Sequence, residues 1–227
     1  MKVSIIKQLF RLSMILLVAF AITQCRENSD SGTSSTTNSG LTEDVISSLP
    51  AEDVSDDEAS GLVFMREEEK LARDVYLSLY AKWNARVFSN ISNSEQTHTD
   101  AIKYLLQKYN IDDPVEYDSL GVFKNETLQA LFDTLVVQGS DSLISALKVG
   151  ALIEEVDIRD IQKELDEHVD NQDIQYVYEN LMRGSRNHLR AFVGNLATLG
   201  VTYTPQILSQ ADYDAIINSP RERGNGH

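Results

Sequence analysis

The strongest constraint on the fold is the spacing of apolar residues between about residue 41 and residue 200. They recur at intervals of three and four, which is the period of one face of an α-helix, and no stretch alternates long enough to predict a β-strand. The prolines stand where segments of this pattern end, namely at Pro50, Pro114, Pro205 and Pro220. The sequence therefore predicts an all-α fold.

Four segments are long enough to be principal helices. We expect them at about residues 57–88, 94–109, 142–168 and 173–199. The polar run "SNISNSE" is expected to break the chain between the first two, and "DNQD" between the last two. Because such breaks are short, each pair should consist of antiparallel neighbours.

A long connection, "NIDDPVEYDSLGVFKNE", separates the two pairs and leads into a smaller helix, "ETLQALFDTLVVQ". After residue 200 the pattern allows one more turn or short helix. Two helix pairs joined by one long crossover are the connectivity of a ferritin-like four-helix bundle. Other four-helix topologies share this outline, so connectivity alone does not decide between them.

The N-terminal 25 residues read as a targeting signal. Basic residues precede an apolar run over residues 13–23, which is too short to span a bilayer but has the length of a signal-peptide core. Cys25, the only cysteine, follows directly, and the segment resembles a bacterial lipoprotein signal with Cys25 as the lipidated residue. Gln24 departs from the small residue usual before that cysteine, so cleavage elsewhere and an uncleaved anchor stay open.

Residues 26–41 are rich in Ser, Thr, Asn and Gly, which predicts a flexible linker. The expected organisation is a signal over 1–25, this linker, a helical domain over 42–215 and a disordered tail over 216–227. The expected location is the cell envelope, on the periplasmic or cell-surface side of a membrane that holds the lipid anchor.

Charge and cysteine content restrict the partners and the metal ligands that this chain can have. The 35 acidic residues outnumber the 20 basic ones, for a net charge of −15, which disfavours binding to nucleic acid or to an anionic membrane surface. A single cysteine rules out a thiolate cluster, so any metal site must use oxygen and nitrogen ligands.

Two predicted helices carry acidic or histidine residues within their apolar stripes. In the first, Glu69 shares a face with Met65 and Tyr76, where a lone charge would be costly. Its neighbours Arg66, Glu67 and Glu68 read as solvated charge. In the second, Glu95 and His98 continue the stripe toward the helix start, and residues three apart can reach one ion.

The third and fourth predicted helices offer further candidates. Glu154 lies within an apolar ridge and Asp157 sits three residues on, while Glu155, one position round, is the alternative because a competing apolar ridge leaves the inward face undecided. His188 lies on the inward stripe of the fourth helix. Ser185 stands where a second Glu-x-x-His motif would need Glu.

This constellation resembles the rubrerythrin-type diiron proteins of the ferritin-like superfamily. "EKLARDVY", "EQTH" and "EEVD" are similar to their ligand motifs, and His188 to their final histidine. Within that group the chain resembles the DUF2202 family, through "FMREEEKLARDVY", "IEEVDI" and "RGSRNHLRAF" over roughly residues 58–200.

The resemblance implies a dinuclear site holding two Fe ions, with Mn or Zn as alternatives. Glu69 would be a terminal ligand, Glu95 and Glu154 would bridge or chelate, and His98 and His188 would each bind one ion. Asp157 would supply the carboxylate missing at Ser185.

Two functions follow as hypotheses. One is a diiron oxidoreductase that reduces peroxide or oxidises ferrous iron, and needs an external electron donor because no cysteine-bound iron can form. The other is a non-enzymatic helical module at the membrane surface that binds a partner or sequesters metal. The expected partners are a membrane and that donor but no nucleic acid, and a homodimer is one assembly compatible with the sequence.

Overall fold

The structure is a computed structural model that describes residues 40–224. Cys25, the signal and nearly all of the predicted linker lie outside the described residues. Within residues 40–224 the secondary structure is entirely helical, which confirms the all-α prediction. None of the helices in this range is long and apolar enough to cross a membrane.

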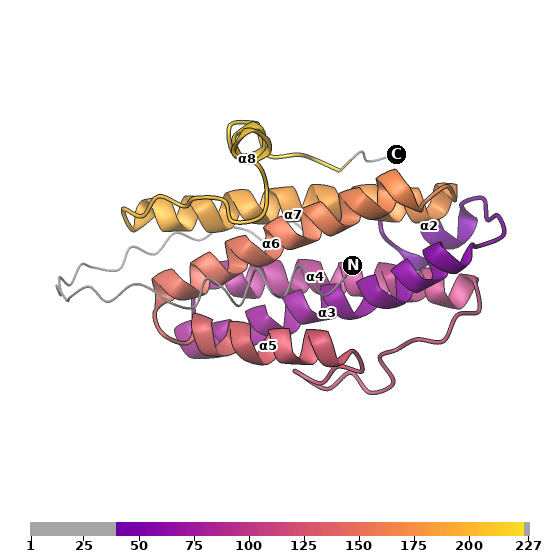
Figure 1. Cartoon of the computed structure of the whole chain (residues 1–227), viewed down its shortest axis with the longest axis horizontal. Helices are drawn as coiled ribbons and strands as arrows, with labels where there is room; N and C mark the ends of the chain where they lie inside the picture. The colour runs from indigo at the N-terminus through magenta and orange to yellow at the C-terminus, as the bar shows by residue number, and fades with distance from the viewer. Residues whose placement is uncertain (1–39, 225–227) are drawn as a thin grey trace. The chain divides into compact units, whose positions relative to one another are not determined.

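Residues 40–224 contain seven helices, which follow one another along the chain (Figure 1). They are α2 (Glu43–Ser48), α3 (Asp56–Trp83), α4 (Arg86–Lys108), α5 (Glu126–Gly139), α6 (Leu143–Glu167), α7 (Gln172–Thr198) and α8 (Gln210–Ile217). The small crossover helix and the third and fourth long helices match their predicted ranges to within a residue or two. The short α2 was not predicted.

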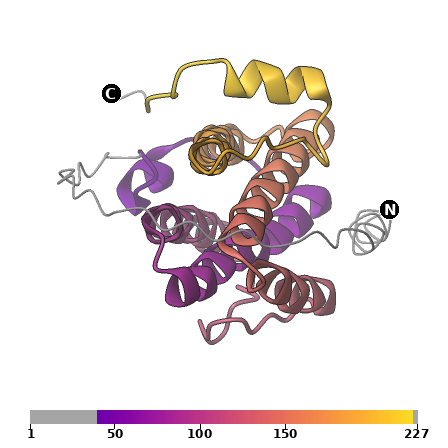
Figure 2. The same cartoon turned by 90° about the vertical axis from the view of Figure 1, so that its left-hand side faces the viewer.

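Four long helices form the body of a helical bundle. Helix α3 packs against α4 and α6 against α7, and the two pairs meet through α3–α6 and α4–α7 contacts. The crossover helix α5 covers α3 and α6, and α2 packs on α4. In the view turned by 90°, α8 crosses over α7 (Figure 2).

The predicted break between the first two helices is wrong in position. Helix α3 ends at Trp83 because Asn84 adopts a left-handed conformation, with φ of 50°. Helix α4 then begins at Arg86 and runs through "SNISNSE". Ser and Asn favour helix ends, but burial of Phe88 and Ile91 in the core outweighs that weak local preference.

The prediction of solvated charge at Arg66, Glu67 and Glu68 is also wrong, because all three are buried. The crossover covers this side of α3. Arg66 pairs with Asp113 of the crossover, and Glu67 accepts hydrogen bonds from the backbone N–H groups at Lys124 and Asn125. These charged groups therefore hold the crossover to α3.

The chain after α7 folds back over α6 and α7. Tyr203 and the backbone N–H groups of residues 206–208 donate hydrogen bonds to Glu155 on α6. Farther on, Glu222 forms ion pairs with Arg186 and Arg190 of α7. The described part of the chain thus includes residues 216–224 of the predicted tail.

Candidate metal centre

Four helices bring five acidic and histidine side chains together in the bundle interior. They are Glu69 of α3, Glu95 and His98 of α4, Glu154 of α6 and His188 of α7, all buried. They form two groups of three, and in each group one ligand atom per residue lies within 4.8 Å of the other two. One group is Glu69, Glu95 and His98, and the other is Glu95, Glu154 and His188.

Glu95 belongs to both groups and lies between the two histidines. Its Oε2 is 2.7 Å from His98 Nδ1 and its Oε1 is 2.8 Å from His188 Nδ1. Neither Glu95 oxygen has a partner in hydrogen-bond geometry, although both are inaccessible to water. Two ligand atoms of one metal ion lie close together in this way, because their lone pairs point at the ion and not at each other.

The outer carboxylates complete the groups. Glu69 Oε2 lies 3.2 Å from His98 Nδ1, and Glu154 Oε2 lies 3.4 Å from His188 Nδ1. Glu69 Oε1 and Glu154 Oε2 are buried without a hydrogen-bond partner. Buried carboxylate oxygens of this kind are costly unless a cation or a proton satisfies them.

Further side chains orient these groups. The Tyr76 hydroxyl donates a 2.6 Å hydrogen bond to Glu154 Oε1, and His188 Nε2 lies 3.0 Å from Ser94 Oγ. Hydrogen bonds of this type fix the tautomer and direction of metal ligands. On α7, a Cβ at Gly184 would lie 2.6 Å from His98 Nε2, so only glycine leaves room for that imidazole.

Apolar layers close the site at both ends. On one side lies a core cluster that includes Met65, Ile102 and Leu181. On the other, the Phe192 ring packs at a tilt against Tyr76 and Phe88, with ring centroids 5.2 Å and 5.6 Å apart. The charged groups therefore lie in a dry interior, where electrostatic interactions are strong.

The buried groups of the site shift one another's pKa. Burial raises the pKa of Glu69 to about 7 and that of Glu154 to about 6, against the lowering effect of the neighbouring histidines. Burial disfavours imidazolium, but Glu95 and Glu154 outweigh it and raise the pKa of His188 to about 9. Burial also opposes ionisation of Glu95, yet His188 and His98 lower its pKa far below the usual range.

Asp157 lies beside both groups without belonging to either. It is 2% exposed, and its Oδ2 has no hydrogen-bond partner. Burial raises its pKa well above the usual value, and the charges of Glu69 and Glu154 raise it further. Ser185 donates its hydroxyl to the Leu181 carbonyl, so it offers no charge to the site.

Glu154 is the inward carboxylate, and Glu155, one position round α6, points toward the C-terminal segment. Glu155 accepts hydrogen bonds from Tyr203 and from backbone N–H groups of that segment, which satisfy its carboxylate. The apolar ridge that competes with the Glu154 face in the sequence is buried as well, at Val149, Leu152 and Val156.

Sequence reasoning missed Ser94 and Glu68, because Ser94 lies in the predicted break and Glu68 among the charges predicted to be solvated. The available signal was the three-residue spacing of Glu154, Asp157 and Asp160, which predicts an acidic strip on one side of that helix.

Known proteins match the helical part of this chain. The family model described as "Uncharacterized protein domain (DUF2202)" matches residues 58–220. The chain belongs to the DUF2202 family. All five side chains of the two groups, together with Asp157, lie inside the matched range.

The chain is similar to the uncharacterized protein MJ0754 of Methanocaldococcus jannaschii. The two are 58% identical over 179 residues, which cover 79% of this chain and 96% of the relative. The crystal structure of the hypothetical protein MJ0754 from Methanococcus jannaschii DSM 2661 matches with a TM-score of 0.75 and 56% identity, over 77% of this chain and 99% of that one. Neither name states a function.

Proposed function

We propose that this DUF2202 chain is a ferritin-like four-helix bundle that holds a dinuclear metal centre. The observation that carries the proposal is the position of Glu95, whose two oxygens each lie against a different histidine. A carboxylate that belongs to both ligand groups is placed to bridge two metal ions. Glu69 and His98 would complete one site, and Glu154 and His188 the other.

The charges support two divalent cations. Glu69, Glu95, Glu154 and Asp157 would together contribute four negative charges, which two divalent ions balance. Buried carboxylates at this density are tolerable when cations neutralise them. Oxygen and imidazole ligands suit Fe or Mn, with Zn as the alternative.

The chemistry proposed for the centre is reduction of peroxide or oxidation of ferrous iron. Bound metals of this type supply electrons and act as Lewis acids. The protein's own groups would hold Glu154 through Tyr76, hold His188 through Ser94 and exclude water with the aromatic layer. Two-electron reduction of peroxide needs an electron source, which we assign to an external donor because a single cysteine cannot form an iron site with several thiolate ligands.

Cys25 and the segment before it would tether this domain to a membrane of the cell envelope, through a lipid on the cysteine. One acyl chain alone gives marginal, reversible binding, so a second anchoring signal or a second chain would be needed for stable attachment. The polar residues after Cys25 would set the distance between domain and membrane.

Thermal melting with and without added Fe(II), Mn(II) or Zn(II) tests the binding part of the proposal. A ligand that binds the native state raises the unfolding midpoint by mass action. An unchanged midpoint with every metal would contradict it. Peroxide consumption by loaded protein then tests the chemistry, and equal rates for wild type and Glu95→Ala would leave a metal-sequestering module as the function.

A further inference from the structure

A strip of carboxylates leads outward from the centre along α6. Glu154, Asp157 and Asp160 are spaced three residues apart and so lie on one side of the helix. The exposed fraction rises along the strip, from zero for Glu154 to 2% for Asp157 and 13% for the Asp160 side chain. The strip therefore connects the buried centre with the surface of the bundle.

Glu68 of α3 faces the outer part of this strip. It is only 5% exposed, and its carboxyl lies within electrostatic range of Asp160 and Asp157. Helix α3, which carries Glu68, packs against α6.

Two oxygens of the strip are buried and have nothing to bond. Glu68 Oε2 and Asp157 Oδ2 are inaccessible to water and lack a hydrogen-bond partner. The nearby Arg159 is held by Asp160 in a two-point ion pair at 2.8 and 2.9 Å.

A purely structural role does not account for these oxygens. The sequence neighbours Glu67 and Glu155 are also buried, but both accept backbone N–H groups and so hold a loop in place. Within residues 40–224, neither Glu68 nor Asp157 accepts a hydrogen bond from a backbone N–H group. Their free oxygens suit a ligand that arrives from outside, and carboxylate oxygens are the ligands that a hard divalent cation prefers.

We propose that Asp160, Glu68 and Asp157 form an acidic path by which divalent cations reach the dinuclear centre. Asp160 would exchange its partner Arg159 for a hydrated cation at the surface. Glu68 and Asp157 would replace its water ligands in turn and pass it to Glu69 and Glu154. The inference rests on the proposed function, since a path needs a destination, and it concerns the rate of loading rather than the number of ions held.

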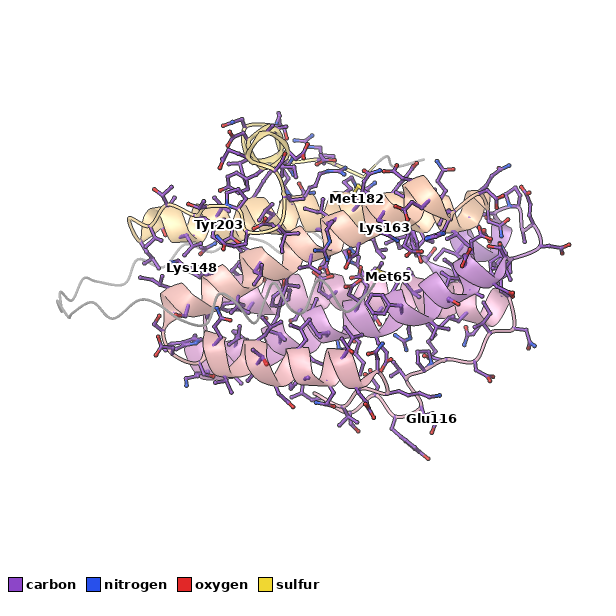
Figure 3. All side chains as sticks on the ribbon, in the orientation of Figure 1. Met65, Glu116, Lys148, Lys163, Met182 and Tyr203 are labelled. Carbon is purple, nitrogen blue, oxygen red and sulfur yellow. The ribbon has the colours of Figure 1, made fainter. Side chains whose placement is uncertain are left out.

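The test is the rate at which metal-free full-length protein takes up Co(II), followed through the visible absorption of the bound ion. Glu68→Gln and Asp160→Asn each remove one charge from the path while keeping the side-chain shape. Glu116→Gln removes one charge from an exposed position on the crossover, away from α6 (Figure 3), and is the matched control. Glu68→Asp keeps the charge. Circular dichroism confirms folding, and the partly exposed Asp160 gives a second variant if Glu68→Gln is unstable.

We expect both path variants to load on the order of tenfold more slowly than wild type, since converging charge of one sign raises association rates by that order or more. Their final cobalt content should equal that of wild type. Glu116→Gln should load at the wild-type rate, and Glu68→Asp close to it. Equal rates for all variants, or an equal slowing in Glu116→Gln, would overturn the path while leaving the centre intact. Absence of cobalt binding in wild type would refute the proposed function itself.

Discussion

The hydroxyl of Tyr76 on α3 donates a 2.6 Å hydrogen bond to Glu154 on α6 and joins the two halves of the bundle at the centre. Tyr203 makes a bond of equal length to Glu155, the next residue along α6. Two tyrosines therefore hold adjacent glutamates in different directions. This pairing provides a matched test of which glutamate serves the metal.

Tyr76→Phe should weaken metal binding while the fold is kept. The phenyl ring can still pack against Phe192, but Glu154 loses the donor that orients it. Loss of such an orienting hydrogen bond typically lowers metal affinity about 10–100-fold. Isothermal titration of metal-free protein measures the effect. Tyr203→Phe is the control and should lower the melting temperature without changing the affinity; an equal loss of affinity in both variants would contradict the assignment of Glu154.

Gly184→Ala should displace His98 and reduce metal affinity. The new Cβ would lie 2.6 Å from the imidazole, which must move because no real contact is that short. Gly194→Ala on the same helix meets nothing within 4 Å and is the control. Both substitutions should gain about 1 kcal/mol of helix propensity. We expect weaker binding only at position 184; identical affinities in the two variants would show that His98 is not a ligand.

The stability of metal-free protein should fall as the pH rises from about 5 to 9. The pKa of Glu69 is raised from 4.5 to about 7, so the folded state holds a proton that the unfolded chain releases between these values. His188, raised from 6.5 to about 9, extends the same behaviour upward. Wherever the folded state binds more protons, stability decreases with increasing pH.

Thermal melts of metal-free protein across that range measure the decline. Bound metal displaces these protons, so the loaded protein should lose the decline and should release protons into unbuffered solution when metal is added. Glu95, whose pKa is lowered, acts in the opposite sense and destabilises the fold only under acid conditions. A flat profile for the metal-free protein from pH 5 to 9 would argue against a proton-filled site.

The lipid anchor is tested by Cys25→Ala. If Cys25 carries the lipid, this variant should move from the membrane fraction to the soluble fraction when cells are broken and fractionated. Cys25 is the only cysteine, so no other thiol can substitute. Unchanged fractionation would leave an uncleaved anchor or a signal cleaved elsewhere as the remaining explanations.

Helical periodicity predicted α5, α6 and α7 closely because their apolar stripes and capping residues agree, as at Ser142, which caps α6. It failed between α3 and α4. There the run of Ser and Asn suggested a break, while the actual turn depends on one left-handed residue, Asn84. Local preference is weak beside burial of an apolar residue such as Phe88.

The inward-facing candidates Glu69, Glu95 and His188 could be read from the sequence, since each interrupts an apolar stripe. The choice between Glu154 and Glu155 could not, because both are buried and only the C-terminal segment shows which is already satisfied. Burial of Glu68 likewise depends on packing against distant chain segments. Contacts between distant segments cannot be predicted from the spacing of residues along one helix.

The most direct test of the dinuclear centre is the metal content of purified protein, with Glu95→Gln as the comparison. Glutamine keeps the shape of Glu95 but removes the charge that lies between His98 and His188. Elemental analysis after loading with Fe(II) or Mn(II) should give about two ions per chain for wild type, as the dinuclear pattern requires. Glu95→Gln should retain at most one. Wild-type protein that remains metal-free, or a variant that keeps two ions, would contradict the shared carboxylate on which the account depends.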